Sequence, residues 1–154
     1  PDLVLLLRFA DCMPVLFYDP VQQAVGLAHA GWRGVAAGVV PATVRAMEKV
    51  FGTAPSDLWA GIGPAIGPDH YEVGLEVVAA IDAALPAGAT ASVQREGRWY
   101  LDMPGAVAAQ LAASGVTRVE QANICTACHI DEWYSHRAEN GQTGRFGVLV
   151  TLEK

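Results

Sequence analysis

AVGLAHAGWRG, residues 24–34, runs directly into VAAGVVPATVRAMEKVF, residues 35–51. The first segment opens as an apolar run of the kind that forms a buried strand. The second has helical spacing, because its larger apolar side chains fall largely on one side: Val39, Val40, Val44, Met47 and Val50. A strand that leads into a helix in this way favours an α/β fold, with His29 and Arg33 between the two elements.

Strand and helix patterns interleave along the rest of the chain. The apolar run at residues 3–9 predicts a strand buried on both faces, and Asp102 predicts the N-cap of a helix that stops at Gly115. Pro41 predicts either a kink or a helix that starts there. We also expect strands at residues 15–18, 24–28, 58–62, 116–124 and 146–152, a hairpin at 92–101 that turns at Glu96 and Gly97, and a helix at 75–85. Because several strands are consecutive, we expect mixed β-sheets packed with helices in one domain, residues 1–154.

The composition argues against several classes of protein. The 154 residues are 52% hydrophobic, which suits one domain with an apolar core. A net charge of −6 argues against a nucleic-acid surface or a basic membrane patch, and no stretch approaches the roughly 20 apolar residues of a membrane span. The first residues lack an export signal, and three cysteines do not suit a disulfide framework, so we expect a cytoplasmic protein. Strand character begins at the third residue, so we also expect that the domain lacks its N-terminal part.

Cys12 and His29 are the first candidates for chemistry. Cys12 follows the strand predicted for residues 3–9, and His29 ends a later strand. If the two strands end side by side, a thiolate meets an imidazole, with Asp11 beside the thiol. That pair suits metal binding, or a cysteine nucleophile with a histidine base. The alternative is a buried cysteine and a hydrogen-bonded core histidine, the more common fate of such residues outside a motif.

The second cluster is CTACH, residues 125–129. It matches C-x-x-C-H, the pattern of covalent haem attachment, but a packed α/β domain without an export signal argues against haem. The same spacing also fits a redox-active cysteine pair or half of a structural zinc site, and both interpretations stay open. We expect Cys125 near the active site, neither cysteine bonded to haem or to the other, and an accidental spacing for Cys128. His70 and His136 are either substrate contacts or polar loop residues.

The arginines are informative because lysine and arginine together number only ten. Arg33 lies at the expected start of a helix, where backbone N–H groups favour anions. Arg137 and Arg145 flank a Gly/Asn turn in SHRAENGQTGR. Three guanidinium groups would bind a phosphate or a carboxylate well. The alternative is ordinary salt bridging at the surface.

Several segments, taken together, resemble the YfiH family. They are ADCMPVLFYDP at residues 10–20, AVGLAHAGWRG at 24–34, GIGPAIGP with YEVG between 61 and 74, NICT at 123–126 and YSHRAENGQTGR at 134–145. The family is also known as the laccase-like multicopper polyphenol oxidoreductases, as DUF152 and as the peptidoglycan editing factor PgeF. The resemblance covers essentially the whole chain in order, and the combination of ADC with HAGWRG is specific.

The resemblance implies a compact α/β fold related to the bacterial-toxin cysteine deamidases. It also implies a metal, usually zinc, held by one cysteine and two histidines. By motif match, the cysteine is Cys12 and one histidine is His29. The resemblance places the other histidine in an upstream His-Gly motif, which these 154 residues do not contain. We therefore expect His29 to be a metal ligand and not a core histidine.

The activity implied by the resemblance is phosphorolysis of purine nucleosides (adenosine, inosine, guanosine and methylthioadenosine) together with adenosine deamination. Zinc with an open position activates water, which suits deamination. Phosphorolysis needs an anion cradle, for which Arg33, Arg137 and Arg145 are candidates. Copper-dependent phenol oxidation, peptidoglycan precursor editing, a hydrolase with Cys12 as nucleophile, and a chain that binds no metal stay open. Four histidines are too few for the trinuclear copper centre of a true laccase.

Overall fold

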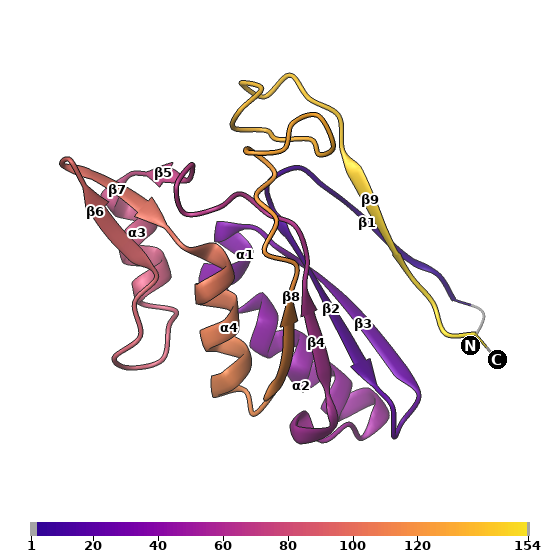
Figure 1. The fold of residues 1–154 in the computed structure, drawn as a ribbon. Coiled ribbons are helices and arrows are strands. Elements are labelled where there is room, and N and C mark those ends of the chain that lie inside the picture. The colour runs from indigo at the N-terminus through magenta and orange to yellow at the C-terminus, as the bar shows by residue number, and fades with distance from the viewer. Residues whose placement is uncertain (1–2, 154) are drawn as a thin grey trace.

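The computed structural model describes residues 3–153 and contains strands, four α-helices and a short 3₁₀ turn (Figure 1). In chain order the elements are β1 (Leu5–Phe9), β2 (Met13–Asp19), β3 (Ala24–Ala30), α1 (Trp32–Ala36), α2 (Val39–Phe51), η1 (Pro55–Asp57), β4 (Trp59–Ile62), β5 (Glu72–Val73), α3 (Leu75–Asp82), β6 (Ser92–Arg95), β7 (Arg98–Leu101), α4 (Met103–Ala113), β8 (Arg118–Gln121) and β9 (Phe146–Val150). The central sheet has the strand order β3-β2-β4-β8, β1 pairs with β9, and a small sheet has the order β5-β7-β6. The predicted mixture is confirmed, because β2 is antiparallel to β3 and β4 whereas β4 is parallel to β8.

Side chains along β3 alternate between the helical layer and the opposite face of the central sheet. Ala24, Ala28 and Ala30 are buried and face the helices, whereas His29 lies on the opposite face of the strand. The helix α2 packs on β3 through a buried stripe at Val40, Val44 and Met47. The ribbon of β1 and β9 lies on the other side of the central sheet from the helices (Figure 1). His29 therefore points away from the helical layer and toward the ribbon.

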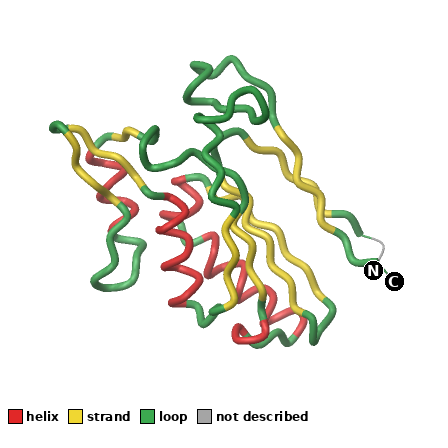
Figure 2. The backbone as a smooth tube through the Cα atoms, in the orientation of Figure 1, coloured by secondary structure: helices red, strands yellow, loops and turns green. Residues whose placement is uncertain are grey.

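One end of the central sheet collects the loops that carry the candidate residues. Because of the strand directions, β3, β4 and β8 end at the edge where β2 begins. Residues 10–12, 63–71 and 122–145 leave or enter the sheet there, and Figure 2 shows these loops gathered at that end. The sheet thus brings together segments that are far apart in the sequence.

The helix predicted for residues 35–51 is two helices, α1 and α2. Gly38 separates them with a φ of 75°, a left-handed conformation that glycine adopts without strain. Pro41 lies in the first turn of α2, where its missing N–H breaks no helical hydrogen bond. Of the two predictions for Pro41, the helix that begins near it is confirmed.

The prediction that residues 3–9 are buried on both faces is wrong. Leu6 and Leu149 are opposite each other in the β1–β9 pairing, and they are 56% and 66% exposed. Within the strand, Phe9 alone is completely buried. The reason is that β1 belongs to a two-stranded ribbon and not to the central sheet, so one of its faces has no layer above it.

The hairpin and the capped helix are confirmed. Glu96 and Gly97 both have positive φ between β6 and β7, as a two-residue turn of this kind requires. The backbone N–H of Gly105 donates to Oδ1 of Asp102 at 3.0 Å, which caps α4.

Several elements are shorter than predicted, most of all the strand at 116–124. The strand β8 covers only four residues of the predicted 116–124, α3 stops before residue 85, and β9 stops before residue 152. The partner of β8, β4, is itself four residues long, and a ladder cannot extend beyond its partner. Within residues 3–153, no helix has both the length and the apolar character needed to cross a membrane.

Candidate active site

A cavity of about 460 Å³ opens at the loop-bearing end of the sheet. All five residues predicted to act together line it: Cys12, His29, Arg33, Arg137 and Arg145. They come from the turn before β2, from β3, from α1 and from the long loop after β8. The structure therefore brings candidate residues from the first and last thirds of the chain into one cavity.

Cys12 and His29 line the same cavity. His29 is directly opposite Pro14 in the β2–β3 ladder, and Cys12 lies in the turn that leads into β2, two residues before Pro14. A Cβ atom on Gly31 would lie 2.8 Å from the Sγ of Cys12. Only glycine leaves room for the sulfur at that position, which explains the first glycine of HAGWRG.

The surroundings of Cys12 disfavour its thiolate. Burial raises the pKa of the Cys12 thiol, the charge of Asp11 raises it further, and Arg145 opposes the two effects. A thiol in such a place ionises when a cation compensates the charge, as a metal ion does.

The alternative of a core histidine is wrong for His29, because its side chain is exposed. The imidazole stacks on Phe9 with ring centroids 4.7 Å apart, and Phe9 stacks in turn on Phe146. Partial burial lowers the pKa of His29, so the ring is neutral at pH 7 and keeps a nitrogen lone pair for a metal or a proton.

Two of the cavity arginines rest on aromatic rings. The guanidinium carbon of Arg33 lies 4.4 Å from the ring centroid of Trp32, and that of Arg137 lies 5.1 Å from the ring centroid of Tyr71. Nη1 of Arg137 also donates to the carbonyl of Glu72 at 2.7 Å. Stacking fixes the plane of a guanidinium and leaves donors at its edge for an anion.

Arg145 and Arg8 complete the positive lining, and Arg8 was not predicted. Nη1 of Arg145 donates to the carbonyls of Thr143 and Gly144 at 3.1 and 2.6 Å. Among residues 3–153 the side-chain ion pairs are Arg95–Asp69 and Arg98–Glu72, so none of the four cavity arginines is neutralised by a carboxylate partner. Ordinary salt bridging therefore does not describe these arginines, and the cavity keeps positive charge in a chain whose net charge is −6.

Asp11 ties the loops around the cavity together. Its carboxylate accepts hydrogen bonds from Oγ1 of Thr126 at 2.7 Å and from the backbone N–H of Arg137 at 2.6 Å. Its carbonyl accepts from the N–H of Ile66 at 3.1 Å. Asp11 has a φ of 73°, which Asp tolerates better than most residues. The side chain of Asp11 thus joins the turn before β2 to the loop after β8, and its backbone carbonyl joins the same turn to the loop after β4.

Comparisons with known proteins establish the family of the chain. The family described as multi-copper polyphenol oxidoreductase laccase matches residues 1–153. The chain belongs to this family. The matches confirm the resemblance found in the motifs.

Curated relatives in this laccase-like family include two purine nucleoside phosphorylases. YlmD of Geobacillus stearothermophilus is 40% identical over 151 residues, which cover 96% of this chain and 55% of YlmD. The enzyme of Bacteroides thetaiotaomicron is 39% identical over 156 residues, covering 97% of this chain and 58% of the relative. The chain thus spans a little over half of the length of these relatives.

Solved structures confirm the YfiH-like fold. The crystal structure of YlmD from Geobacillus stearothermophilus matches with a TM-score of 0.92 and 38% identity, covering 96% of this chain and 56% of that one. The crystal structure of YfiH from Bacillus licheniformis matches with a TM-score of 0.94 and 38% identity, covering 99% and 59%.

Tyr71 is a site residue that was not predicted individually, although it opens the YEVG segment of the laccase-like resemblance. It lines the cavity beneath Arg137, and burial raises the pKa of its phenol to about 12, with a further contribution from Cys12. The phenol is therefore protonated at pH 7 and can donate a hydrogen bond. His136, whose role was open, lines the same cavity.

Cys125 does not line the cavity of Cys12. It lines a separate hollow of about 370 Å³, and its connection to the candidate active site runs through its neighbour Thr126, which donates to Asp11. Cys125 and Cys128 are both free thiols. The sulfur of Cys128, whose spacing we expected to be accidental, lies within 4.8 Å of the sulfur of Cys125 and of a ring nitrogen of His70.

Replacing Asp11 with alanine is expected to lower the free energy of unfolding by about 2–4 kcal/mol. The variant loses two hydrogen bonds to a charged acceptor, at about 1.5–3 kcal/mol each before exposure is discounted, and alanine is strained at a left-handed position by about 1–2 kcal/mol. Urea denaturation measures the change. Asp11→Asn is the matched control, because asparagine tolerates this backbone and keeps one carbonyl acceptor, so it should lose less. Equal stability of the alanine variant and the wild type would show that Asp11 does not tie the loops together.

Proposed function

We propose that the protein cleaves purine nucleosides with phosphate in the arginine-lined cavity, where Cys12 and His29 hold a zinc ion. The observation that carries the proposal is a thiol–imidazole pair beside four arginines that have no carboxylate partner within the described chain. The names of the relatives, purine nucleoside phosphorylases, support the same reaction. The substrates are therefore small molecules, a nucleoside and phosphate.

The arginines supply the anion cradle that phosphorolysis requires. Phosphate has to lie beside C1′ of the ribose while the base departs, and guanidinium groups bind it bidentately. Arg33 and Arg137 are already oriented by Trp32 and Tyr71, so little side-chain freedom is lost when the anion binds. The helix α1 is only five residues long, so the positive charge comes from the guanidinium groups and not from the helix.

The donor set of the cavity fits zinc. A thiolate sulfur and a neutral imidazole nitrogen are preferred zinc ligands, and Cys12 and His29 line the same cavity. When bound, zinc supplies a Lewis acid that polarises an oxygen or activates water. A thiolate also suits copper, which remains the alternative metal and would favour phenol oxidation.

The site also supports adenosine deamination as a second reaction, because an open coordination position beside the cavity suits the activation of water. A hydrolase with Cys12 as nucleophile is less well supported. Reactive cysteines have a lowered pKa, whereas burial and Asp11 raise the pKa of Cys12.

The cavity has the size and lining for a nucleoside. Its volume of about 460 Å³ falls within the range of small-molecule sites, and Trp32, Tyr71, Met13 and Met103 offer apolar surface for a base and a ribose. The three free cysteines favour a reducing compartment, so we place the reaction in the cytoplasm.

The test is a panel of adenosine, inosine, guanosine and methylthioadenosine, assayed with and without phosphate on the zinc-loaded protein. We expect release of the base and formation of ribose 1-phosphate only when phosphate is present, and conversion of adenosine to inosine without it. Oxygen consumption with phenols is measured in parallel. Phenol oxidation by a folded, metal-loaded protein that releases no base from any nucleoside would contradict the proposal.

A further inference from the structure

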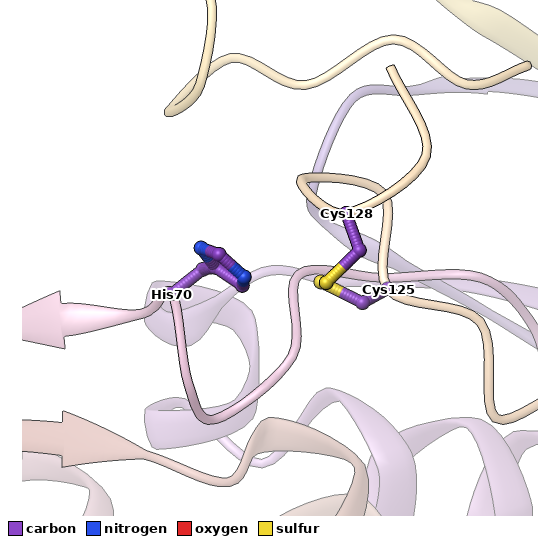
Figure 3. A group of neighbouring side chains, drawn as sticks. All are labelled: His70, Cys125 and Cys128. Atoms are coloured by element: carbon purple, nitrogen blue, oxygen red, sulfur yellow. The ribbon is translucent and has the colours of Figure 1, made fainter. Parts of the chain in front are cut away.

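A second group of metal-binding side chains lies outside the arginine-lined cavity. His70 belongs to the loop after β4, and Cys125 and Cys128 belong to the loop after β8. One ligand atom from each lies within 4.8 Å of the others. Figure 3 shows the imidazole and the two sulfurs turned toward the same space from these two loops.

Local backbone structure sets up this arrangement. The N–H of Cys128 donates to the carbonyl of Cys125 at 3.2 Å, which closes the turn that aligns the two thiols. The N–H of His70 donates to the carbonyl of Gly67 at 3.1 Å in a second turn. The N–H of Gly67 donates in addition to the Sγ of Cys125 at 3.2 Å, a contact that joins the two turns.

The chemistry of the three side chains matches zinc. Two cysteines in C-x₂-C spacing with one histidine form a known zinc ligand set. Zinc–sulfur and zinc–nitrogen bonds of about 2.3 and 2.0–2.1 Å require ligand atoms about 4 Å apart or less. The three ligand atoms already lie within 4.8 Å of one another. Rotation of the side chains alone can therefore bring them to that geometry.

We propose that His70, Cys125 and Cys128 bind one zinc ion, separate from any ion at Cys12 and His29. The carboxylate of the neighbouring Asp69 is paired with Arg95 and is not one of the three ligands. None of the three ligands lines the arginine-lined cavity, and the proposal therefore stands independently of the proposed nucleoside chemistry.

The ion fastens two loops that shape the active site. Tyr71, which supports Arg137, directly follows His70. Thr126, which donates to Asp11, directly follows Cys125. Zinc at this second site therefore braces a wall of the cavity without touching the substrate.

The experiment measures zinc binding in a Cys12→Ser protein, reduced and freed of metal, so that the second site is observed alone. We expect one zinc ion per chain. At a free zinc concentration about 100 times the Kd, we expect alkylation of Cys125 and Cys128 to slow about 100-fold, because mass action leaves about 1% of the sites empty. Cobalt added in place of zinc should give the absorption bands of thiolate coordination.

Three substitutions make the test specific. Cys128→Ser and His70→Ala should each lose the bound zinc and the protection from alkylation. His129→Ala is the matched control, since His129 is an exposed histidine of the same loop outside the group, and it should keep both. If the Cys12 variant fails to fold, the same test is made with Cys12 intact. Cys128→Ser should then bind one zinc ion fewer than the wild-type protein.

Three results would overturn the proposal. They are zinc binding that Cys128→Ser does not change, equal losses in His70→Ala and His129→Ala, and a Cys125–Cys128 disulfide that forms in place of metal binding under reducing conditions. The last result would assign the pair to redox chemistry.

Discussion

Replacing Cys12 with serine is expected to release zinc from the arginine-lined cavity and to lower nucleoside turnover by more than about 100-fold. Loss of groups that merely support metal ligands costs about 10–100-fold, and Cys12 is a proposed ligand itself. The remaining imidazole of His29 binds zinc weakly without the thiolate. Zinc content and kcat/KM are measured on the same preparation, for phosphorolysis and for deamination.

Cys128→Ser is the matched cysteine control for turnover, because it removes a thiol that does not line the cavity. It should lose the zinc ion of the second site but cost far less turnover than Cys12→Ser. Bound zinc is counted per chain against the wild type, because the proposed second site keeps its own ion. Two outcomes of the Cys12 variant would contradict the account. A Cys12 variant that binds one zinc ion fewer yet keeps full turnover shows that the metal at Cys12 takes no part in the reaction. A Cys12 variant that binds as much zinc as the wild type and loses turnover favours Cys12 as a nucleophile.

Replacing Arg33 with alanine is expected to lower phosphorolysis on the order of 100-fold, the cost of removing one donor that stabilises developing charge. Deamination should fall much less, because it needs no phosphate. Arg33→Lys should be intermediate, since lysine keeps the charge but cannot bind phosphate bidentately. The measurement is kcat/KM at several phosphate concentrations.

Arg45→Ala is the control for charge, because Arg45 is an exposed arginine of α2 that does not line the cavity. It should leave both reactions near the wild-type rates. Equal losses of phosphorolysis and deamination in Arg33→Ala would show that Arg33 supports the site as a whole and does not hold phosphate.

Motifs were sufficient to predict that Cys12, His29 and Arg33 lie close together, because strand ends and the turn that follows them are recognised from local sequence. Arg137 and Arg145 were also predicted, as arginines that flank a turn. Their proximity to His29 depends on the long loop after β8 returning to the edge where β3 ends, and sequence spacing does not contain that information.

Residues whose role depends on sheet order could not be predicted. Asp11 was visible only as a neighbour of the thiol, although it bonds Thr126 and Arg137 across more than half of the chain. His70 meets Cys125 because β4 and β8 are parallel neighbours, so their following loops leave the same edge. The apolar run at residues 3–9 gave no sign that β1 would pair with β9 in an exposed ribbon.

The most direct test of the central claim is a crystal structure of the zinc-loaded protein with phosphate, with anomalous diffraction recorded at the zinc edge. The account predicts an anomalous peak about 2.3 Å from the Sγ of Cys12 and about 2.0–2.1 Å from a ring nitrogen of His29, with phosphate bound to Arg33 and Arg137. A zinc peak at His70, Cys125 and Cys128 with none at Cys12 and His29, and no phosphate on these arginines, would contradict it.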